Sequence, residues 1–197
     1  MYRIAITGHA NSGKDTLSKM LVKQLRKEKG RYISAGYIAF ADPIKEMALC
    51  MFPNLPRKYF FGSSQYRKTI IPGAFKNGQP LTVRQVLLDL GTEVGRSYKD
   101  DIWLDNFDIA FKEKYYKGIV VATDVRFSNE FDHLKNKGFQ QIKLYRNTEE
   151  PGINHISETD QNSISDNDYD FVIHNDNTLN SLKQLIVNDI IPRLKDI

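Results

Sequence analysis

The sequence contains a single cysteine, Cys50, which excludes the internal disulfide framework that stabilises small secreted domains. It has no run of 18 or more apolar residues, so we expect no membrane-spanning helix and no membrane partner. The first apolar segment is too short and too soon interrupted for a signal peptide. These absences predict a soluble protein of a reducing compartment, the cytoplasm. Because Cys50 lies in the apolar run Met47–Phe52, we expect its thiol to be buried.

A strong excess of charge of one sign is also absent. Lys and Arg number 28 against 24 Asp and Glu, which gives a formal net charge of +4. No segment alternates basic and aromatic residues as single-strand binding grooves do, so we expect no nucleic-acid partner. With 41% hydrophobic and 26% charged residues the chain is an ordinary globular protein, and its 197 residues favour a single domain over two independent cores.

Short apolar segments alternate with helical patterns along the chain. The candidate strands are residues 2–7, 37–40, 118–124, 139–145 and 170–174. The candidate helices are residues 14–29, a helix that starts near Pro43, and residues 83–90, 101–116, 130–137 and 178–192. Nearly continuous apolar strands between helices are typical of a parallel sheet covered on both faces. We therefore predict an α/β fold with five parallel strands.

Two segments interrupt this alternation. Residues 53–81 hold four of the seven prolines and several basic residues, which predicts an irregular excursion. The excursion ends where Thr82 and Gln85 have the spacing of a capping box. Residues 146–169 are polar and rich in Asn, Asp and Ser, which predicts a loop or lid.

A phosphate-binding pattern lies between the first predicted strand and the first predicted helix. It reads Gly8-x-x-x-x-Gly13-Lys14. Glycines allow successive backbone N–H groups to face an anion, and the helix that follows adds its positive dipole end. The lysine can reach the β- and γ-phosphates of a nucleotide. We expect the nucleotide to contact Gly8, Asn11, Ser12, Gly13, Lys14, Asp15 and Thr16.

The residue after the lysine departs from the usual pattern. A Ser or Thr is expected there to hold Mg²⁺, whereas this sequence has Asp15 followed by Thr16. A carboxylate is a good ligand for Mg²⁺, so the metal site can use either residue. The sequence leaves the choice between Asp15 and Thr16 open.

Three further residues are candidates for the phosphoryl-transfer site. Asp124 ends the third strand, at the edge where ligands bind in open α/β sheets, and could hold the water shell of Mg²⁺, orient an acceptor or cap a turn. Arg126 could neutralise phosphate charge or pair with Asp124 or Glu130. Arg146 is the only arginine of residues 146–169, and could close over the transferring group or lie on the surface.

Several blocks together resemble one family. They are Ser12-Gly13-Lys14-Asp15-Thr16, Ala39-Phe40-Ala41-Asp42-Pro43-Ile44-Lys45, Arg84-Gln85-Val86-Leu87-Leu88-Asp89-Leu90-Gly91-Thr92-Glu93, Asp124-Val125-Arg126 with Glu130, His155-Ile156-Ser157-Glu158, and Asp176-Asn177-Thr178-Leu179. In this order, and over nearly the whole chain, they are similar to the phage-type deoxynucleoside monophosphate kinases, which are P-loop kinases.

The resemblance implies an enzyme that uses ATP and Mg²⁺ to convert deoxynucleoside monophosphates (dNMPs) to diphosphates, as a homodimer in the host-cell cytoplasm. It makes residues 42–117 an acceptor-binding excursion and residues 146–169 a lid. It assigns to the acceptor site Asp42, Ile44, Lys45, Gln85, Gly91, Thr92, Trp103, Asp124, Arg126 and Glu130. It places Lys45 at the acceptor phosphate, and Asn175 and Asn177 beside the adenine.

Several of these roles have structural alternatives. Trp103 could stack on a base or belong to the core, Gln85 could read a base edge or complete the capping box, and residues 175–177 could border adenine or form a helix-entry turn. An ionised acceptor phosphate needs no general base, and we find no catalytic triad. Two other functions stay open: a P-loop kinase of dephospho-coenzyme A or phosphomevalonate, and a nucleotide-binding regulator without transfer.

Overall fold

The computed structural model describes residues 1–30, 32–114, 118–146, 156–176 and 178–196. These residues form two compact units. Unit 1 consists of Met1–Ala39 and Phe107–Ile197, and unit 2 of Phe40–Asn106.

Within the described residues, unit 1 is built on one five-stranded sheet. Its strands are β1 (Tyr2–Thr7), β2 (Ala35–Ile38), β5 (Ile119–Val125), β6 (Gln140–Tyr145) and β7 (Phe171–His174), in the order β2-β5-β1-β6-β7. Every neighbouring pair is parallel, which confirms the predicted fold class. Strand β2 begins two residues before the predicted segment and ends at Ile38. Because all five strands are parallel, their carboxyl ends lie at the same edge of the sheet.

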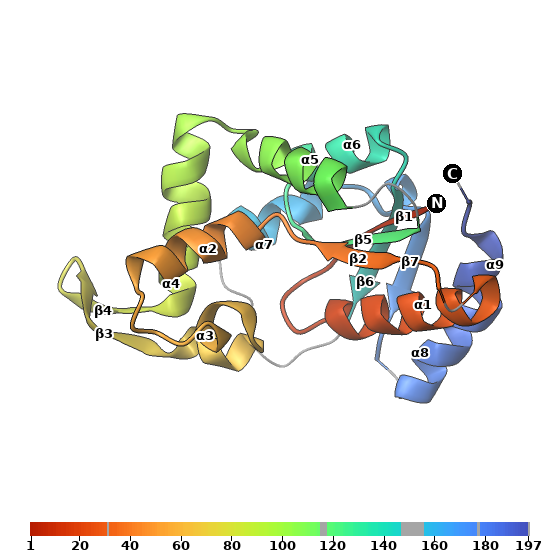
Figure 1. Cartoon of the computed structure of the whole chain (residues 1–197), viewed down its shortest axis with the longest axis horizontal. Coiled ribbons are helices and arrows are strands. Elements are labelled where there is room, and N and C mark those ends of the chain that lie inside the picture. The colour runs from red at the N-terminus through yellow and green to blue at the C-terminus, as the bar shows by residue number, and fades with distance from the viewer. Residues whose placement is uncertain (31, 115–117, 147–155, 177, 197) are drawn as a thin grey trace. The chain divides into compact units, whose positions relative to one another are not determined.

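Helices cover both faces of this sheet (Figure 1). On one face lie α1 (Lys14–Lys29), α8 (Leu179–Leu185), η5 (Ile186–Ile190) and α9 (Ile191–Arg193). Leu17, Leu21 and Leu25 of α1 are fully buried there, since their spacing of four places them on one side of the helix. The other face is covered by α6 (Ser128–Asn136) and by α5 (Ile102–Lys114), from which the rings of Phe107 and Phe111 contact Phe139.

Unit 2 contains regular structure where the sequence predicted an irregular excursion. It comprises α2 (Asp42–Met51), α3 (Lys58–Phe61), η1 (Ser64–Lys68), β3 (Ile70–Lys76), β4 (Gln79–Thr82), α4 (Val83–Leu88) and η2 (Asp89–Arg96). Strands β3 and β4 form an antiparallel hairpin. Its two turn residues, Asn77 and Gly78, both have positive φ, 51° and 76°. Asn-Gly is the preferred sequence of such a turn, so the hairpin signal was present in the sequence and was overlooked.

The helix that begins with the capping box is longer than predicted. Thr82 and Gln85 form both reciprocal bonds of the box, as expected. The helix continues beyond Leu90 as the π-helical segment η2, which ends at Arg96. Trp103 explains this continuation, because its indole Nε1 donates to the Gly91 carbonyl at 2.7 Å and supports the altered hydrogen-bond pattern.

The prediction for Cys50 was wrong. Helix α2 buries Ile44 and Ala48 and leaves Met47, Cys50 and Met51 exposed. The apolar run is longer than the buried stripe of one helical face, so part of it turns outward. Among the residues the structure describes, no helix is both long and apolar enough to cross a membrane.

Partly buried ion pairs between Asp108 of α5 and two residues in and after α6 make the stability of unit 1 depend on pH. Asp108 accepts from His133 at 2.8 Å and from Lys137 at 2.9 Å. Burial would raise the pKa of Asp108, but the hydrogen bonds from Lys137 and His133 outweigh it and lower the pKa below its ordinary value.

We predict that Asp108→Asn lowers the free energy of unfolding at neutral pH by about 1.5–3 kcal/mol, the usual contribution of hydrogen bonds to a charged group. The contribution of a carboxylate with a lowered pKa is complete above its unfolded pKa of about 4 and disappears as the pH falls through its folded pKa. Urea unfolding from pH 7 to pH 3 measures this. The two proteins should differ down to about pH 4 and converge below it, and a difference independent of pH would contradict the prediction.

Candidate functional site

The loop between β1 and α1 has the backbone that phosphate binding requires. Ser12 N donates to the His9 carbonyl at 3.2 Å, which closes a turn whose third residue, Asn11, has a positive φ of 64°. Gly13 follows with a φ of 99° and is the N-cap of α1. These two left-handed residues bring the chain directly from the sheet edge to the positive end of the helix dipole.

The glycines of this loop also permit close packing against the neighbouring strands. A Cβ atom on Gly8 would lie 2.5 Å from the Leu144 carbonyl oxygen of β6. A Cβ atom on Gly13 would lie 2.6 Å from Nδ2 of Asn175, which follows β7. Asn175 Nδ2 in turn donates to the Ser12 carbonyl at 2.9 Å. The loop therefore packs against the carboxyl ends of β6 and β7.

The loop offers a cation and a free polar group to an anion. Lys14 Nζ donates to the carbonyls of Gly8 at 2.5 Å and His9 at 2.7 Å, so the ammonium lies over the loop. The Ser12 hydroxyl is buried, and no residue in the described part of the chain bonds to it. A buried polar group without a partner carries a desolvation cost that a bound phosphate oxygen would remove. The residues present thus fit a nucleotide phosphate.

Asp15 and Thr16 are both exposed in the first turn of α1. Each can supply a hard oxygen ligand to Mg²⁺. The described residues contain no group of three His, Cys, Asp or Glu side chains arranged for a metal. A P-loop site does not require one, because Mg²⁺ is held by one or two protein oxygens together with water and phosphate.

Asp124 lies beside the start of this loop. The strand pairing aligns Thr7 of β1 with Val125 of β5, after a register shift at Thr123 and Asp124. Asp124 is half-buried near the carboxyl edge of the sheet, although β5 continues for one residue beyond the predicted strand end, to Val125. The fold therefore brings Asp124 and the phosphate loop together within unit 1.

Glu130 serves a local purpose that the sequence did not indicate. Its buried carboxylate accepts from the backbone N–H of Arg126 at 2.9 Å and of Phe127 at 3.2 Å. These bonds fix the turn that joins β5 to α6 and hold the backbone of Arg126 at the sheet edge. The carboxylate is thus engaged in capping α6, and its assignment to the acceptor site rests on the resemblance alone.

The second half of the predicted lid belongs to unit 1 and packs against the rest of it. It contains α7 (Ile156–Thr159), η3 (Asp160–Ser163) and η4 (Asp166–Asp168). Asp160 accepts from Ser128 N at 2.7 Å, and Asp166 accepts from both Lys143 Nζ and Tyr145 Oη at 2.8 Å. Arg146 directly follows β6 and is exposed, whereas Asn177 and residues 147–155 lie outside the described residues.

Lys143 anchors this segment from a buried position on β6. Burial would lower the pKa of its ammonium, but hydrogen bonds with Asp166 and Tyr145 raise the pKa above its ordinary value. The pKa of Asp166 is lowered by the same contacts, from Lys143 first and Tyr145 second. Both partners therefore stay charged at neutral pH, which fixes η4 on the sheet beside the phosphate loop.

Gln161 is a residue near the phosphate loop that the sequence did not single out. Its side chain is 1% exposed, and its Nε2 lies 3.0 Å from Nδ1 of His9. This contact joins η3 to the phosphate loop over a separation of 152 residues. A single polar residue in an Asn- and Asp-rich segment gives no sequence signal that could have revealed it.

We predict that Gln161→Met raises the KM for ATP several-fold and lowers the free energy of unfolding by about 1 kcal/mol, because a buried hydrogen bond to the loop is lost. Steady-state kinetics and urea unfolding measure the two effects. His9→Ala should produce a similar change, and the double variant should be little worse than either single one. Fully additive effects would show that the contact does not connect the two segments.

The predicted acceptor residues of unit 2 have mainly structural contacts. Gly91 allows η2 to approach α2, because a Cβ atom there would lie 3.0 Å from Ile44 Cδ1. Trp103 is only 4% exposed, so its ring packs in the core of unit 2 and shows no free face for a base. Gln85 is exposed, but its Oε1 is engaged by Thr82.

Three other predicted acceptor residues of unit 2 carry polar side chains. Lys45 Nζ pairs with Asp42 at 2.8 Å, and Thr92 is half-buried on η2. Lys45 also lies 5.3 Å from the centre of the Phe61 ring, which Arg57 covers at 3.8 Å. The sequence assigned no role to Arg57 or Phe61, since both fall in the segment that was predicted to be irregular.

Comparison with known proteins identifies the family of the chain. Residues 56–186 match the family model of deoxynucleotide monophosphate kinase. A putative deoxynucleotide monophosphate kinase of Acanthamoeba polyphaga mimivirus is 29% identical over 205 residues, which cover 95% of each chain. The dephospho-CoA kinase from Campylobacter jejuni, a solved structure, shares 16% identity over 98% of this chain and 97% of that one, with a TM-score of 0.45. By the family match over two thirds of its length, the chain belongs to the deoxynucleotide monophosphate kinase family.

Proposed function

We propose that this protein transfers the γ-phosphate of ATP to a deoxynucleoside monophosphate and so forms a deoxynucleoside diphosphate and ADP. The observation that carries the proposal is the phosphate loop at the N-terminus of α1, which holds the Lys14 ammonium and a buried Ser12 hydroxyl that no described residue bonds. The family match supports a kinase that acts on deoxynucleotides. No acceptor outside this class is favoured by the residues of the site.

In this proposal the residues of unit 1 hold the donor. The loop backbone from Gly8 to Gly13 binds the β- and γ-phosphates, and Lys14 neutralises charge on the transferring group. Asp15 or Thr16 would hold Mg²⁺, which would supply positive charge that stabilises the transferring phosphate. Asp124 orients the acceptor or the water around the metal. Asn175 supports the loop from below, and the adenine lies near residues 175–177.

Two arginines complete the charge neutralisation in this proposal. Arg126, whose backbone is fixed by Glu130, faces the transferring phosphoryl group, and Arg146 reaches it from the predicted lid. The acceptor phosphate attacks in line without a general base, because it is already ionised at neutral pH. Exclusion of water by the lid would limit hydrolysis of ATP.

The acceptor binds through unit 2 in this proposal. Lys45 and Asp42 are its polar contacts, and Ile44, Gly91 and Thr92 form the adjoining surface. Trp103 supports this surface from the core, since its indole bonds Gly91. Gln85 combines its capping role with an amide nitrogen that could read a base edge.

A coupled assay of ADP formation tests the proposal. The wild-type protein is mixed with ATP, Mg²⁺ and, separately, dTMP, dGMP, 5-hydroxymethyl-dCMP, dephospho-coenzyme A or phosphomevalonate. We expect turnover with at least one deoxynucleotide and none with the last two. Turnover with dephospho-coenzyme A or phosphomevalonate alone would overturn the substrate class. ATP binding without turnover of any acceptor would show a regulator instead of an enzyme.

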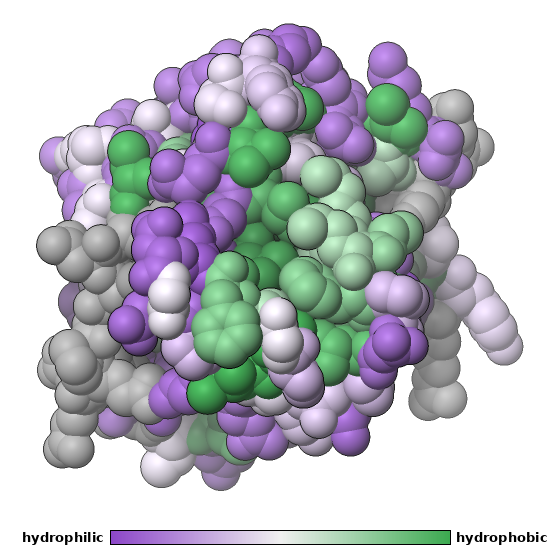
Figure 2. Space-filling view, turned by 90° about the vertical axis from the view of Figure 1, so that its left-hand side faces the viewer, coloured by the Kyte–Doolittle hydropathy of each residue, from purple (hydrophilic) through white to green (hydrophobic). Residues whose placement is uncertain are grey.

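We further propose that the protein forms a homodimer. Hydrophobic side chains gather on the side of unit 2 that faces the viewer in Figure 2. In α2, Met47 and Met51 are 42% and 57% exposed beside Cys50. Sedimentation equilibrium of the wild-type protein tests this, and a monomer at micromolar concentration would contradict it.

A further inference from the structure

One face of α2 carries charged side chains in place of apolar ones. Asp42, Lys45 and Glu46 follow the i, i+3, i+4 spacing and so lie on the same side of the helix. Ile44 and Ala48 on another side are buried and hold α2 in unit 2. The buried residues therefore hold α2 in place, and its charged side chains have a defined position in unit 2.

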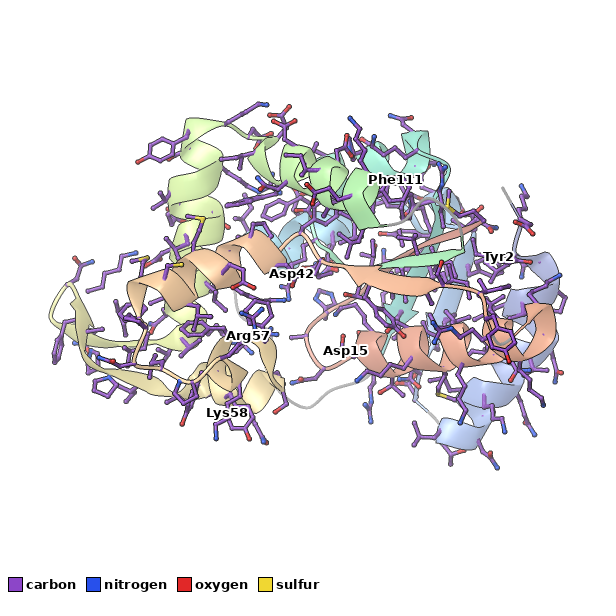
Figure 3. The ribbon with its side chains drawn as sticks, in the orientation of Figure 1. Tyr2, Asp15, Asp42, Arg57, Lys58 and Phe111 are labelled. Carbon is purple, nitrogen blue, oxygen red and sulfur yellow. The ribbon has the colours of Figure 1, made fainter. Side chains whose placement is uncertain are left out.

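Arg57 meets this charged face from the start of α3 (Figure 3). Its guanidinium carbon lies over the Phe61 ring, 3.8 Å from the ring centre. Arg57 Nη1 donates to Glu46 Oε2 at 2.9 Å, and Nη2 donates to Glu46 Oε1. Lys45 lies over the same ring at 5.3 Å. Stacking on Phe61 thus orients the guanidinium while Glu46 engages it with two oxygens.

The contact between Arg57 and Glu46 has the geometry of phosphate recognition. A guanidinium donates two parallel N–H groups equally well to a carboxylate or to two phosphate oxygens. The pair is open to solvent, with side-chain exposures of 55% and 51%. An exposed ion pair favours its bound state over its separated state by no more than about fivefold, so a competing anion can readily displace the Glu46 carboxylate. A phosphate dianion, with more charge and three oxygens, would compete well for the guanidinium.

The charges of the four side chains around Phe61 favour the replacement of the Glu46 carboxylate by a phosphate. Lys45 and Arg57 carry two positive charges, which Asp42 and Glu46 balance. Hydrogen bonding by Arg57 lowers the pKa of Glu46, so the carboxylate is ionised at neutral pH and holds the guanidinium in place. Lys58, the next cation along the chain, instead lies over the rings of Tyr59 and Tyr66. Arg57 is thus the cation that shares the Phe61 ring with Lys45.

We propose that Arg57, with Lys45, binds the phosphate of the acceptor nucleotide, and that Glu46 occupies the guanidinium until this phosphate displaces it. The proposal rests on the proposed function, which supplies a monophosphate as acceptor. It assigns Arg57 as a substrate-binding residue and Glu46 as a positioning residue that competes with the substrate. Phe61 keeps the guanidinium plane in one orientation in both states.

The chain contains a matched control pair in unit 1. Arg193 lies over the Phe171 ring at 4.6 Å and donates from Nη1 to Asp189 at 3.0 Å. Its side-chain exposure of 57%, and that of 55% for Asp189, match those of Arg57 and Glu46. The experiment compares Arg57→Ala, Arg57→Lys and Glu46→Gln with Arg193→Ala and Asp189→Asn. It measures the KM for the best deoxynucleoside monophosphate, the KM for ATP and the melting temperature.

We expect Arg57→Ala to raise the acceptor KM about 10- to 100-fold, as loss of a bidentate phosphate contact should. Arg57→Lys should restore little of this, because an ammonium cannot donate the parallel pair. Glu46→Gln should lower the acceptor KM about two- to fivefold, because the competitor is weakened. The KM for ATP should stay within twofold throughout, and the Arg193 and Asp189 variants should keep the wild-type acceptor KM.

An unchanged acceptor KM in Arg57→Lys would overturn the proposal, as would a rise in Glu46→Gln or an equal effect in Arg193→Ala. Arg57→Lys and Glu46→Gln decide the question even where Arg57→Ala fails to fold, because both preserve the size of the side chain. Failure of the proposed function looks different. In that case the wild-type protein itself phosphorylates no deoxynucleotide, and both proposals are overturned together.

Discussion

Replacement of Lys14 by methionine is expected to lower kcat for deoxynucleotide phosphorylation about 10²- to 10³-fold. The transferring phosphoryl group spreads negative charge over its oxygens, and loss of one fixed cation or donor aimed at such charge commonly costs this much. Lys14 is the cation that the loop already holds, since its ammonium is bonded to the Gly8 and His9 carbonyls. The coupled ADP assay at saturating ATP and acceptor measures the effect.

Two comparisons make the Lys14 result specific. Lys19→Met removes an exposed lysine from the same helix and should leave kcat within twofold. Thermal unfolding should show that Lys14→Met is folded, because the side chain it loses is not part of the core. Retention of more than a tenth of the wild-type kcat would mean that the loop does not hold the transferring phosphate, and the proposed function would then lose its principal support.

The largest effect on stability is expected at Trp103. Trp103→Ala should lower the free energy of unfolding by about 3–5 kcal/mol, because it empties a core position that is 4% exposed. It also leaves the Gly91 carbonyl without the indole N–H at the π-helical turn. For a chain of this size, this corresponds to a fall in melting temperature of roughly 6–20 °C. Differential scanning calorimetry measures it.

Trp103→Phe separates the core role from base stacking. It keeps a ring but removes the bond to Gly91, and should cost about 1–3 kcal/mol of stability with the acceptor KM within about twofold of wild type. Tyr98→Ala, which removes an aromatic side chain that is 81% exposed in the same unit, should cost less than about 0.5 kcal/mol. A large rise in acceptor KM for Trp103→Phe at unchanged stability would show that the indole contacts the base after all.

The sequence predicted the parts of the fold that depend on local pattern. The run of apolar strands gave the parallel sheet, and the leucine spacing of residues 14–29 gave α1 and its buried face. The glycines before Lys14 predicted the phosphate loop, because few other residues adopt its backbone. The β3–β4 hairpin has a local signal in its Asn-Gly turn, whereas the prolines of residues 53–81 predicted an irregular segment there.

Other features follow from contacts between distant segments and had no local signal. Cys50 is exposed because Ile44 and Ala48, and not the whole apolar run, face the core. Gln161 contacts His9 of the phosphate loop across a separation of 152 residues. Arg57 and Glu46 are eleven residues apart, and only the packing of α3 against α2 joins them over Phe61.

By itself the sequence determined the phosphate loop, the α/β class and the resemblance to deoxynucleoside monophosphate kinases. These depend on residue types at fixed short spacings, which constrain the backbone directly. Only the tertiary structure decided which polar side chains face one another, because those pairs come from separate elements. A hydrogen bond or ion pair of this kind requires a distance of a few ångströms, and the order of residues along a chain does not specify such a distance.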